Sequence, residues 1–312
     1  MDIFTHLVFG ALIYNLFLKE VTYDYLQYAI FIAVLPDLDV FIAPLKRVFK
    51  SNYLEHRSGS HSYVIGVIIS AIIGAIYSIV TQQSFFVIWI IGIFFYGTHV
   101  SLDLLNTTKI PCFYPISKKE YCFYVEKAGS SFTLVTSVIF LIHFLIFYNP
   151  IPDLITLYLI INIWTYFMLI YYSYRILTKI WISSRLEENQ KYFPGVLPFY
   201  YIIFEKEIVG DTISLHLEKK SHFSRSKLIY KNNATLLPQE MELLKEALRI
   251  CMETYYYAKW TVLPIFFRND NVFSIRFFFI EPMVRSRAMY NQFDFDKNTS
   301  RLIDNKQRYS HI

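Results

Sequence analysis

Hydrophobic positions are concentrated in six long runs within the first 180 residues of the chain. These runs are, to within a few residues, Ile3–Leu18, Tyr25–Pro44, Ser62–Val80, Phe85–Leu105, Thr133–Tyr148 and Ile151–Ile176. An α-helix of about 20 apolar residues crosses the roughly 30 Å hydrocarbon core of a bilayer. The pattern therefore predicts a mainly α, polytopic membrane helical bundle of about six spans over residues 1–176.

The first run, Ile3–Leu18, is the shortest, and two further interpretations apply to it. It has neither a basic segment before it nor a small-residue cleavage site after it, which favours a retained helix over a signal peptide. A helix of this length also fits a position partly in the membrane interface, in which case the number of spans is five.

Beyond Arg185 the long runs give way to short alternations of apolar and polar residues. Tyr200–Glu205 and Thr212–Leu217 alternate on either side of a Val209-Gly210-Asp211 turn, which predicts a β-hairpin. Pro238 begins a stretch of helix-forming residues with helical apolar spacing. The sequence thus predicts a small cytoplasmic α+β domain after the membrane helices. Its predicted parts are a linker helix at residues 177–191, the domain at 192–284 with a strand at Val272–Ile280, and a polar tail at 285–312.

Composition and charge agree with a membrane protein. Hydrophobic residues make up 54% of the 312 residues, more than a soluble domain usually carries. Basic residues gather in alternate connections, and the positive-inside rule then places both termini in the cytoplasm. They are Lys46, Lys50, Arg47, Arg57, Lys109, Lys118, Lys119, Lys127, Arg175, Lys179 and Arg185. The net charge of +5 is modest, and we predict no nucleic-acid binding.

Ionisable side chains within or beside apolar runs are costly, so their positions point to function. Four groups of this kind occur: His6; Asp37 with Asp39; His56 with His61; and His99 with Asp103. With the predicted topology, all four groups fall at the cytoplasmic ends of their runs. Scattered histidines and aspartates would not be expected to share one membrane depth, whereas a common site requires it.

The residue types and spacings predict a divalent metal site. His99 and Asp103 are four residues apart and lie on one face of a helix. Pro36 breaks or kinks the second run and turns the two aspartates inward, and Gly59 provides a bend between the paired histidines. Imidazole and carboxylate ligands suit Zn, Mn or Fe, as one or two ions. The predicted ligands are His6, Asp37, Asp39, His56, His61, His99 and Asp103.

Several of these residues have alternative roles. Asp39 is either a ligand or an acceptor that stabilises the kink, and it is also a candidate general base. Arg57 is a candidate for holding a substrate anion, and a contact to a lipid headgroup is an equally good interpretation. His143 is expected to be a helix-packing residue, and Asp2 a helix-terminal charge or a partner of a ligand.

The ordered motifs resemble a known family over roughly residues 1–175. They are Thr5-His6-x-x-x-Gly10, Leu35-Pro36-Asp37-x-Asp39, His56-Arg57-x-x-x-His61-Ser62 and His99-x-x-x-Asp103. This set resembles the YdjM-like proteins, described as LexA-binding, inner-membrane-associated, metal-dependent hydrolases. The resemblance implies a bacterial inner-membrane hydrolase, zinc-dependent, in which these histidines and aspartates hold the metal.

We therefore expect an enzyme that hydrolyses a phosphoester or a lipid-related ester by metal-activated water at the cytoplasmic face. The substrate is expected to be a lipid or a small-molecule ester. A second interpretation is a metal-stabilised membrane protein without catalysis, whose C-terminal domain recruits a protein partner. A transporter is a weaker interpretation, because transport sites usually lie near the middle of the membrane.

Overall fold

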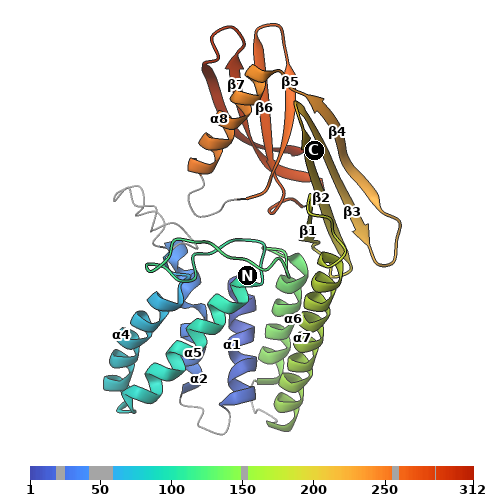
Figure 1. Ribbon diagram of the computed structural model, residues 1–312. Helices are drawn as coiled ribbons and strands as arrows, with labels where there is room; N and C mark the ends of the chain where they lie inside the picture. Colours follow the sequence, from blue (N-terminus) through green and yellow to red (C-terminus); the bar gives the residue numbers. More distant parts are fainter. Residues whose placement is uncertain (19–24, 42–58, 149–153, 255–259, 285) are drawn as a thin grey trace. The chain divides into compact units, whose positions relative to one another are not determined.

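The computed structural model describes residues 1–18, 25–41, 59–148, 154–254, 260–284 and 286–312. The chain forms two compact units, which Figure 1 shows and which are described separately below. The first unit contains Met1–Phe123 and Ala128–Leu177, and the second contains Tyr124–Lys127 and Thr178–Ile312.

The first unit is helical in the residues that the structure describes. Its elements are α1 (Ile3–Phe17), α2 (Leu26–Val34), the 3-10 helix η2 (Leu35–Phe41), α4 (Tyr63–Thr81), α5 (Phe85–Leu104), α6 (Ser131–Tyr148) and most of α7 (Leu154–Ser183). Asp2 caps α1 by accepting a hydrogen bond from the backbone N–H of Thr5, and Ser62 caps α4 in the same way. Helix α2 packs against α1 and α5, and α4 packs along α5.

The prediction of about six spans is wrong. Among the described residues, only α4 and α5 are both long and apolar enough to cross a membrane. Helix α1 has 15 residues and α2 has nine, so they rise only about 22 Å and 14 Å. The second run is split because Pro36 lacks an N–H and its ring clashes with the preceding turn, which ends α2 and begins η2.

The last two runs also differ from the prediction. The described apolar part of α6 ends at Ile146, which leaves a helix too short for a span. Helix α7 has 30 residues, and within the described residues it is not one of the two candidate spans. The orientation of the termini stays a prediction.

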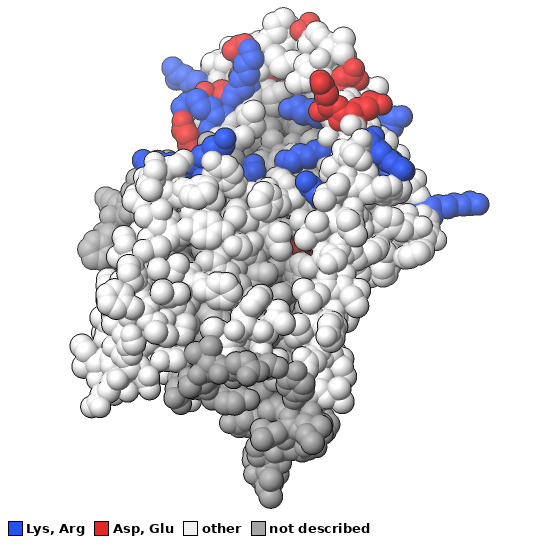
Figure 2. All heavy atoms as spheres, turned by 60° about the horizontal axis from the view of Figure 1, so that its bottom comes forward, with Lys and Arg blue, Asp and Glu red and all other residues white. Residues whose placement is uncertain are grey.

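Charged side chains are nearly absent from the helices of the first unit. The sequence has no Asp, Glu, Lys or Arg from residue 58 to residue 102, which includes all of α4. White spheres, which mark residues other than Asp, Glu, Lys and Arg, cover most of the described surface in Figure 2. Apolar side chains such as Ile72, Ile79 and Ile90 are exposed on α4 and α5, as expected for helices that face lipid.

Helices α4 and α5 approach closely because small residues lie at their contact. A Cβ atom on Gly66 of α4 would lie 2.4 Å from the ring of Tyr96 on α5, and one on Gly92 of α5 would lie 2.8 Å from Cβ of Ser70 on α4. Small residues at such positions allow helices in membranes to pack backbone to backbone. The buried ring of Tyr96 in turn aims its hydroxyl at the carbonyl of Ser60, to which it donates a hydrogen bond.

The second unit contains two four-stranded antiparallel sheets and one helix. The first sheet has the order β1 (Gln190–Pro194), β2 (Tyr200–Val209), β3 (Thr212–Ser221) and β4 (Lys227–Thr235). After α8 (Pro238–Thr254), the second has the order β5 (Val262–Arg268), β6 (Val272–Phe279), β7 (Arg287–Asp296) and β8 (Leu302–His311). One hydrophobic core combines side chains from both sheets with Ala247 and Cys251 of α8.

Part of this unit was predictable. The hairpin around Gly210, the helix after Pro238 and the strand at Val272 are confirmed as β2–β3, α8 and β6. The predicted linker helix ends earlier, since α7 continues only to Ser183. The polar tail predicted for residues 285–312 instead contains β7 and β8. Its polar residues alternate with core side chains in β7, and β8 is the edge strand, whose side chains are mostly exposed.

The start of α8 is fixed by a hydrogen bond from the residue before it to Glu240 and by an ion pair. Pro238 is its first residue, and Glu240 accepts a hydrogen bond from the backbone N–H of Leu237 at 2.9 Å. The same carboxylate accepts two hydrogen bonds from Arg268 of β5, each 2.8 Å long. These hydrogen bonds, above all those from Arg268, hold the pKa of Glu240 below its usual value.

The first prediction concerns the α4–α5 contact. Gly66→Ala should lower the thermal unfolding midpoint of the full-length protein in detergent, because overpacking of this kind costs about 1–3 kcal/mol. Gly97→Ala is the matched control, since its Cβ would lie 3.9 Å from the Tyr63 ring, an ordinary contact. Equal midpoints for the two variants would contradict the close packing.

The second prediction concerns pH and the second unit. A lowered pKa means that Glu240 stabilises the fold above its unfolded-state pKa, and that this contribution is lost as the pH falls through the lowered value. Glu240→Gln should therefore destabilise the sheets at pH 7, and its difference from wild type should shrink as the pH falls below about 4. Infrared melting of the β signal measures this. Glu242→Gln, in an exposed pair with Lys245, should change little.

Candidate metal centre

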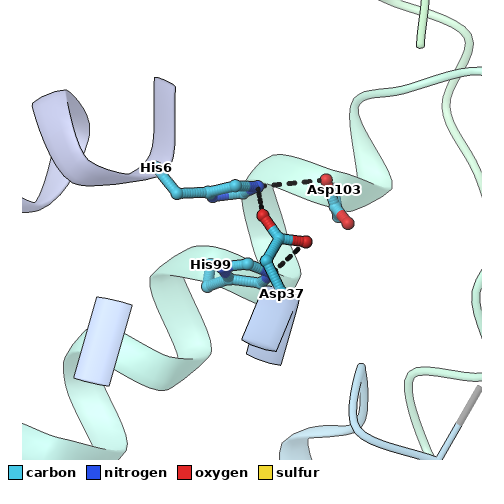
Figure 3. A group of neighbouring side chains, drawn as sticks. All are labelled: His6, Asp37, His99 and Asp103. Carbon is cyan, nitrogen blue, oxygen red and sulfur yellow. Dashed lines mark hydrogen bonds and ion pairs between the residues drawn. The ribbon is translucent and has the colours of Figure 1, made fainter. Parts of the chain in front are cut away.

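Five buried side chains from four segments of the first unit meet at one place. His6 comes from α1, Asp37 from η2, His61 from the turn before α4, and His99 and Asp103 from α5. Each of His6, Asp37, His99 and Asp103 offers one ligand atom, and these four atoms lie within 4.8 Å of one another. Figure 3 shows these four side chains pointing toward a common centre.

The imidazole of His6 lies between the two carboxylates. Its Nε2 is 3.3 Å from Oδ1 of Asp103 and 3.7 Å from Oδ2 of Asp37, along the dashed lines of Figure 3. Its ring stacks on that of His99 with centroids 3.6 Å apart. Because α1 is capped at Asp2, one turn before His6, the cap fixes the helix from which this imidazole projects.

His61 faces the other oxygen of each carboxylate. Its Nε2 lies 3.5 Å from Oδ1 of Asp37, 3.1 Å from Oδ2 of Asp103 and 3.2 Å from Nε2 of His99. Each aspartate thus presents one oxygen to His6 and the other to His61. A carboxylate in this position can bind one ion or bridge two.

Hydrogen bonds behind the histidines select their tautomers. Nδ1–H of His99 donates to the carbonyl of Ala33 at 2.8 Å, so its Nε2 carries a lone pair. The hydroxyl of Ser60 donates its one proton to Asp39, so Nδ1–H of His61 donates to this hydroxyl at 3.0 Å. With both rings neutral, the two Nε2 atoms, 3.2 Å apart, face each other as lone pairs, an arrangement that a cation between them would stabilise.

The donor set fits a divalent metal ion. Ligands bound at about 2.0–2.2 Å in a tetrahedron lie roughly 3.3–3.6 Å apart; the His–Asp pairs here span 3.1–3.9 Å, and the four ligand atoms lie within 4.8 Å of one another. Both oxygens of Asp37 are buried and accept no hydrogen bond within the part of the chain that the structure describes. A buried carboxylate without such compensation is costly, and a bound cation removes that cost.

Asp103 has further contacts at the edge of the group. Nδ2 of Asn106 donates to its Oδ1 at 2.9 Å, and the amino group of Met1 also contacts this oxygen. Asn106 follows Asp103 by about one helical turn, a spacing that could have identified it as a residue that orients the carboxylate. Ser60 and the carbonyl of Ala33 were also missed, and no sequence pattern marks them.

Five of the seven predicted metal ligands come together in the structure. It brings His6, Asp37, His61, His99 and Asp103 together, whereas Asp39 lies behind His61, with Oδ2 3.6 Å from Nδ1. The predicted ligand His56 and the predicted substrate contact Arg57 lie outside the described residues. Metal binding itself stays a prediction for all of them.

Asp2 and His143, for which roles other than metal binding were predicted, make hydrogen bonds within their own helices. Asp2 accepts hydrogen bonds from the backbone N–H and the hydroxyl of Thr5 at 3.0 and 2.7 Å, as a helix cap. His143 is exposed on α6, and its Nδ1–H donates to the carbonyl of Ile139 at 2.8 Å.

The third prediction tests the metal itself. Purified protein should contain one or two equivalents of Zn or Mn by elemental analysis, and Asp37→Asn should lower the affinity more than about tenfold, because it removes a carboxylate that faces both histidines. His143→Gln is the matched control and should keep the full metal content. Wild type that holds no metal after reconstitution, or Asp37→Asn that holds as much as wild type, would refute the site.

Comparison with protein-family models identifies the family of the chain. A model of the YdjM inner membrane protein family matches residues 1–182, more than half of the chain and all of the metal-centre residues. No curated protein matches the chain, and no solved structure does. The protein belongs to the YdjM inner membrane protein family.

Proposed function

We propose that the protein is a metal-dependent hydrolase of the inner membrane that cleaves a phosphoester or lipid-related ester at the cytoplasmic face. One observation carries the proposal: two imidazole Nε2 lone pairs and the oxygens of two buried aspartates converge from separate segments on one centre. Imidazole with carboxylate suits Zn best, and Mn or Fe are further candidates, as one or two ions.

The residues behind the ligands support a catalytic role. A bound divalent cation supplies a water of pKa near 7 and neutralises the charge of phosphoryl oxygens. Asp39 and Ser60 orient His61, and the carbonyl of Ala33 orients His99. Asp39 therefore acts as a positioning residue for His61 in this proposal, and a general base is the alternative role for its carboxylate.

The surroundings of the site support a substrate associated with the membrane. His61 precedes the first residue of α4 by two positions, and Asp103 lies in the last turn of α5, so the centre lies at one end of both candidate spans. The outer surfaces of these helices expose large apolar side chains, including Ile68, Ile76 and Phe86. An ester near a lipid headgroup would be presented at this depth, which favours phosphoesters among the candidate substrates.

A metal-stabilised binding or regulatory protein is the second candidate. The observation that favours it is the number of donors, since His6, Asp37, His61, His99 and Asp103 can fill every position around one ion. Catalytic metal sites keep a position open for water, whereas structural sites are closed. In this case the second unit would recruit a protein partner.

The fourth prediction separates these candidates. Asp39→Asn should retain the metal content of wild type and lower kcat for hydrolysis of aryl phosphoesters or phospholipids about 10–100-fold, with a smaller change in KM, because His61 loses its orientation. Asp270→Asn, exposed in the turn between β5 and β6, is the control for the lost charge. Metal-loaded wild type without turnover on phosphate, carboxylic or amide esters would favour the binding protein.

A further inference from the structure

A large apolar groove lies on the first unit beside α5. Its volume is about 810 Å³, within the range of about 300–1,000 Å³ found for ligand pockets. One wall is α5, with Phe94, Gly97, Thr98 and Ser101, and the other is the connection from α5 to α6, with aromatic side chains such as Tyr121. In Figure 1 this connection lies across the end of the helices at which α5 finishes.

The groove and the metal centre use different faces of α5. Phe94, Gly97, Thr98 and Ser101 follow the helical spacing of three and four residues and share one face. His99 and Asp103 project from another face and are each 1% exposed, whereas Ser101 is exposed. An occupant of the groove therefore does not displace a candidate metal ligand.

The hydroxyls of Tyr63, Thr98 and Ser101 in the groove already make hydrogen bonds within the protein. The hydroxyls of Tyr63 and Ser101 are 2.8 Å apart, and Ser101 donates to the carbonyl of Gly97 at 2.8 Å. The hydroxyl of Thr98 donates to the carbonyl of Phe94 at 2.8 Å. The remaining surface is apolar and fits a hydrocarbon chain better than a polar ligand.

A cation and exposed apolar side chains lie at the edge of the groove. Nζ of Lys119 is 5.4 Å from the centroid of the Tyr121 ring, which lines the groove. The same connection exposes Phe113, Ile116 and Phe123, at 46%, 81% and 51%. Aromatic and basic side chains in combination are typical of the interface between hydrocarbon and headgroups, where lysine attracts anionic lipids.

We propose that this groove binds an anionic phospholipid of the surrounding bilayer, with an acyl chain along α5 and the phosphate near Lys119. The site would hold one lipid in a fixed position against a helix that also carries the candidate metal ligands. The proposal does not depend on hydrolysis, because it rests on the groove, the cation at its edge and the membrane context alone.

The fifth prediction measures lipid binding to the full-length protein in detergent. Phosphatidylglycerol at about 100 times its Kd should raise the thermal unfolding midpoint by roughly 5–10 °C, and phosphatidylcholine with the same acyl chains should raise it less. Lys119→Glu should remove the preference for phosphatidylglycerol. Gly97→Leu should remove the shift from both lipids, because its side chain enters the groove.

Two control variants make comparable substitutions outside the groove. Lys227→Glu, exposed on β4, repeats the charge reversal, and Val87→Phe, on the exposed surface of α5, adds bulk outside the groove. Both should respond to lipid as wild type does. Equal shifts from the two lipids in wild type, or an unchanged preference in Lys119→Glu, would overturn the proposal even if Gly97→Leu fails to fold. Metal content, measured in parallel, should stay unchanged, so failure here is distinct from failure of the metal centre.

Discussion

The first unit depends on one electrostatic constraint: several proton acceptors converge in a buried, apolar helical environment. Nε2 of His61 lies 3.5 Å from Asp37, 3.1 Å from Asp103 and 3.2 Å from Nε2 of His99, and with both rings neutral neither Nε2 supplies a proton to these contacts. Burial of such a group is unfavourable unless positive charge compensates it. A divalent cation is the simplest compensation, and it would also tie α1, η2 and α5 together.

The packing of the helices serves the same centre. Pro36 ends α2 after nine residues, so this helix is too short to span a membrane. The η2 turn that follows buries Asp37 and Asp39. Gly66 makes room for the ring of Tyr96, whose hydroxyl holds the carbonyl of Ser60 next to His61. Small residues between α4 and α5 thus position an imidazole as well as stabilising the helix pair.

The sequence predicted features that depend on residues close together in the chain, and it did not predict features that depend on contacts between distant segments. The spacing of His99 and Asp103 on α5 and the hairpin around Gly210 follow from short-range periodicity, and both occur in the structure. Hydropathy alone could not show that the second run divides into α2 and η2, or that β8 completes a sheet beside β7. The orientation of His61 by Ser60 and Asp39 requires a tertiary arrangement that no spacing encodes.

The connection between α5 and α6 contributes residues to both units, because Tyr124–Lys127 belong to the second unit and the residues on either side belong to the first. Phe123 lines the groove of the first unit, while the next residue, Tyr124, belongs to the second, where its hydroxyl donates to Glu281 at 3.1 Å. Nζ of Lys127 donates to the carbonyl of Glu281 at 2.8 Å. These two hydrogen bonds join Tyr124 and Lys127 of the connection to Glu281 within the second unit.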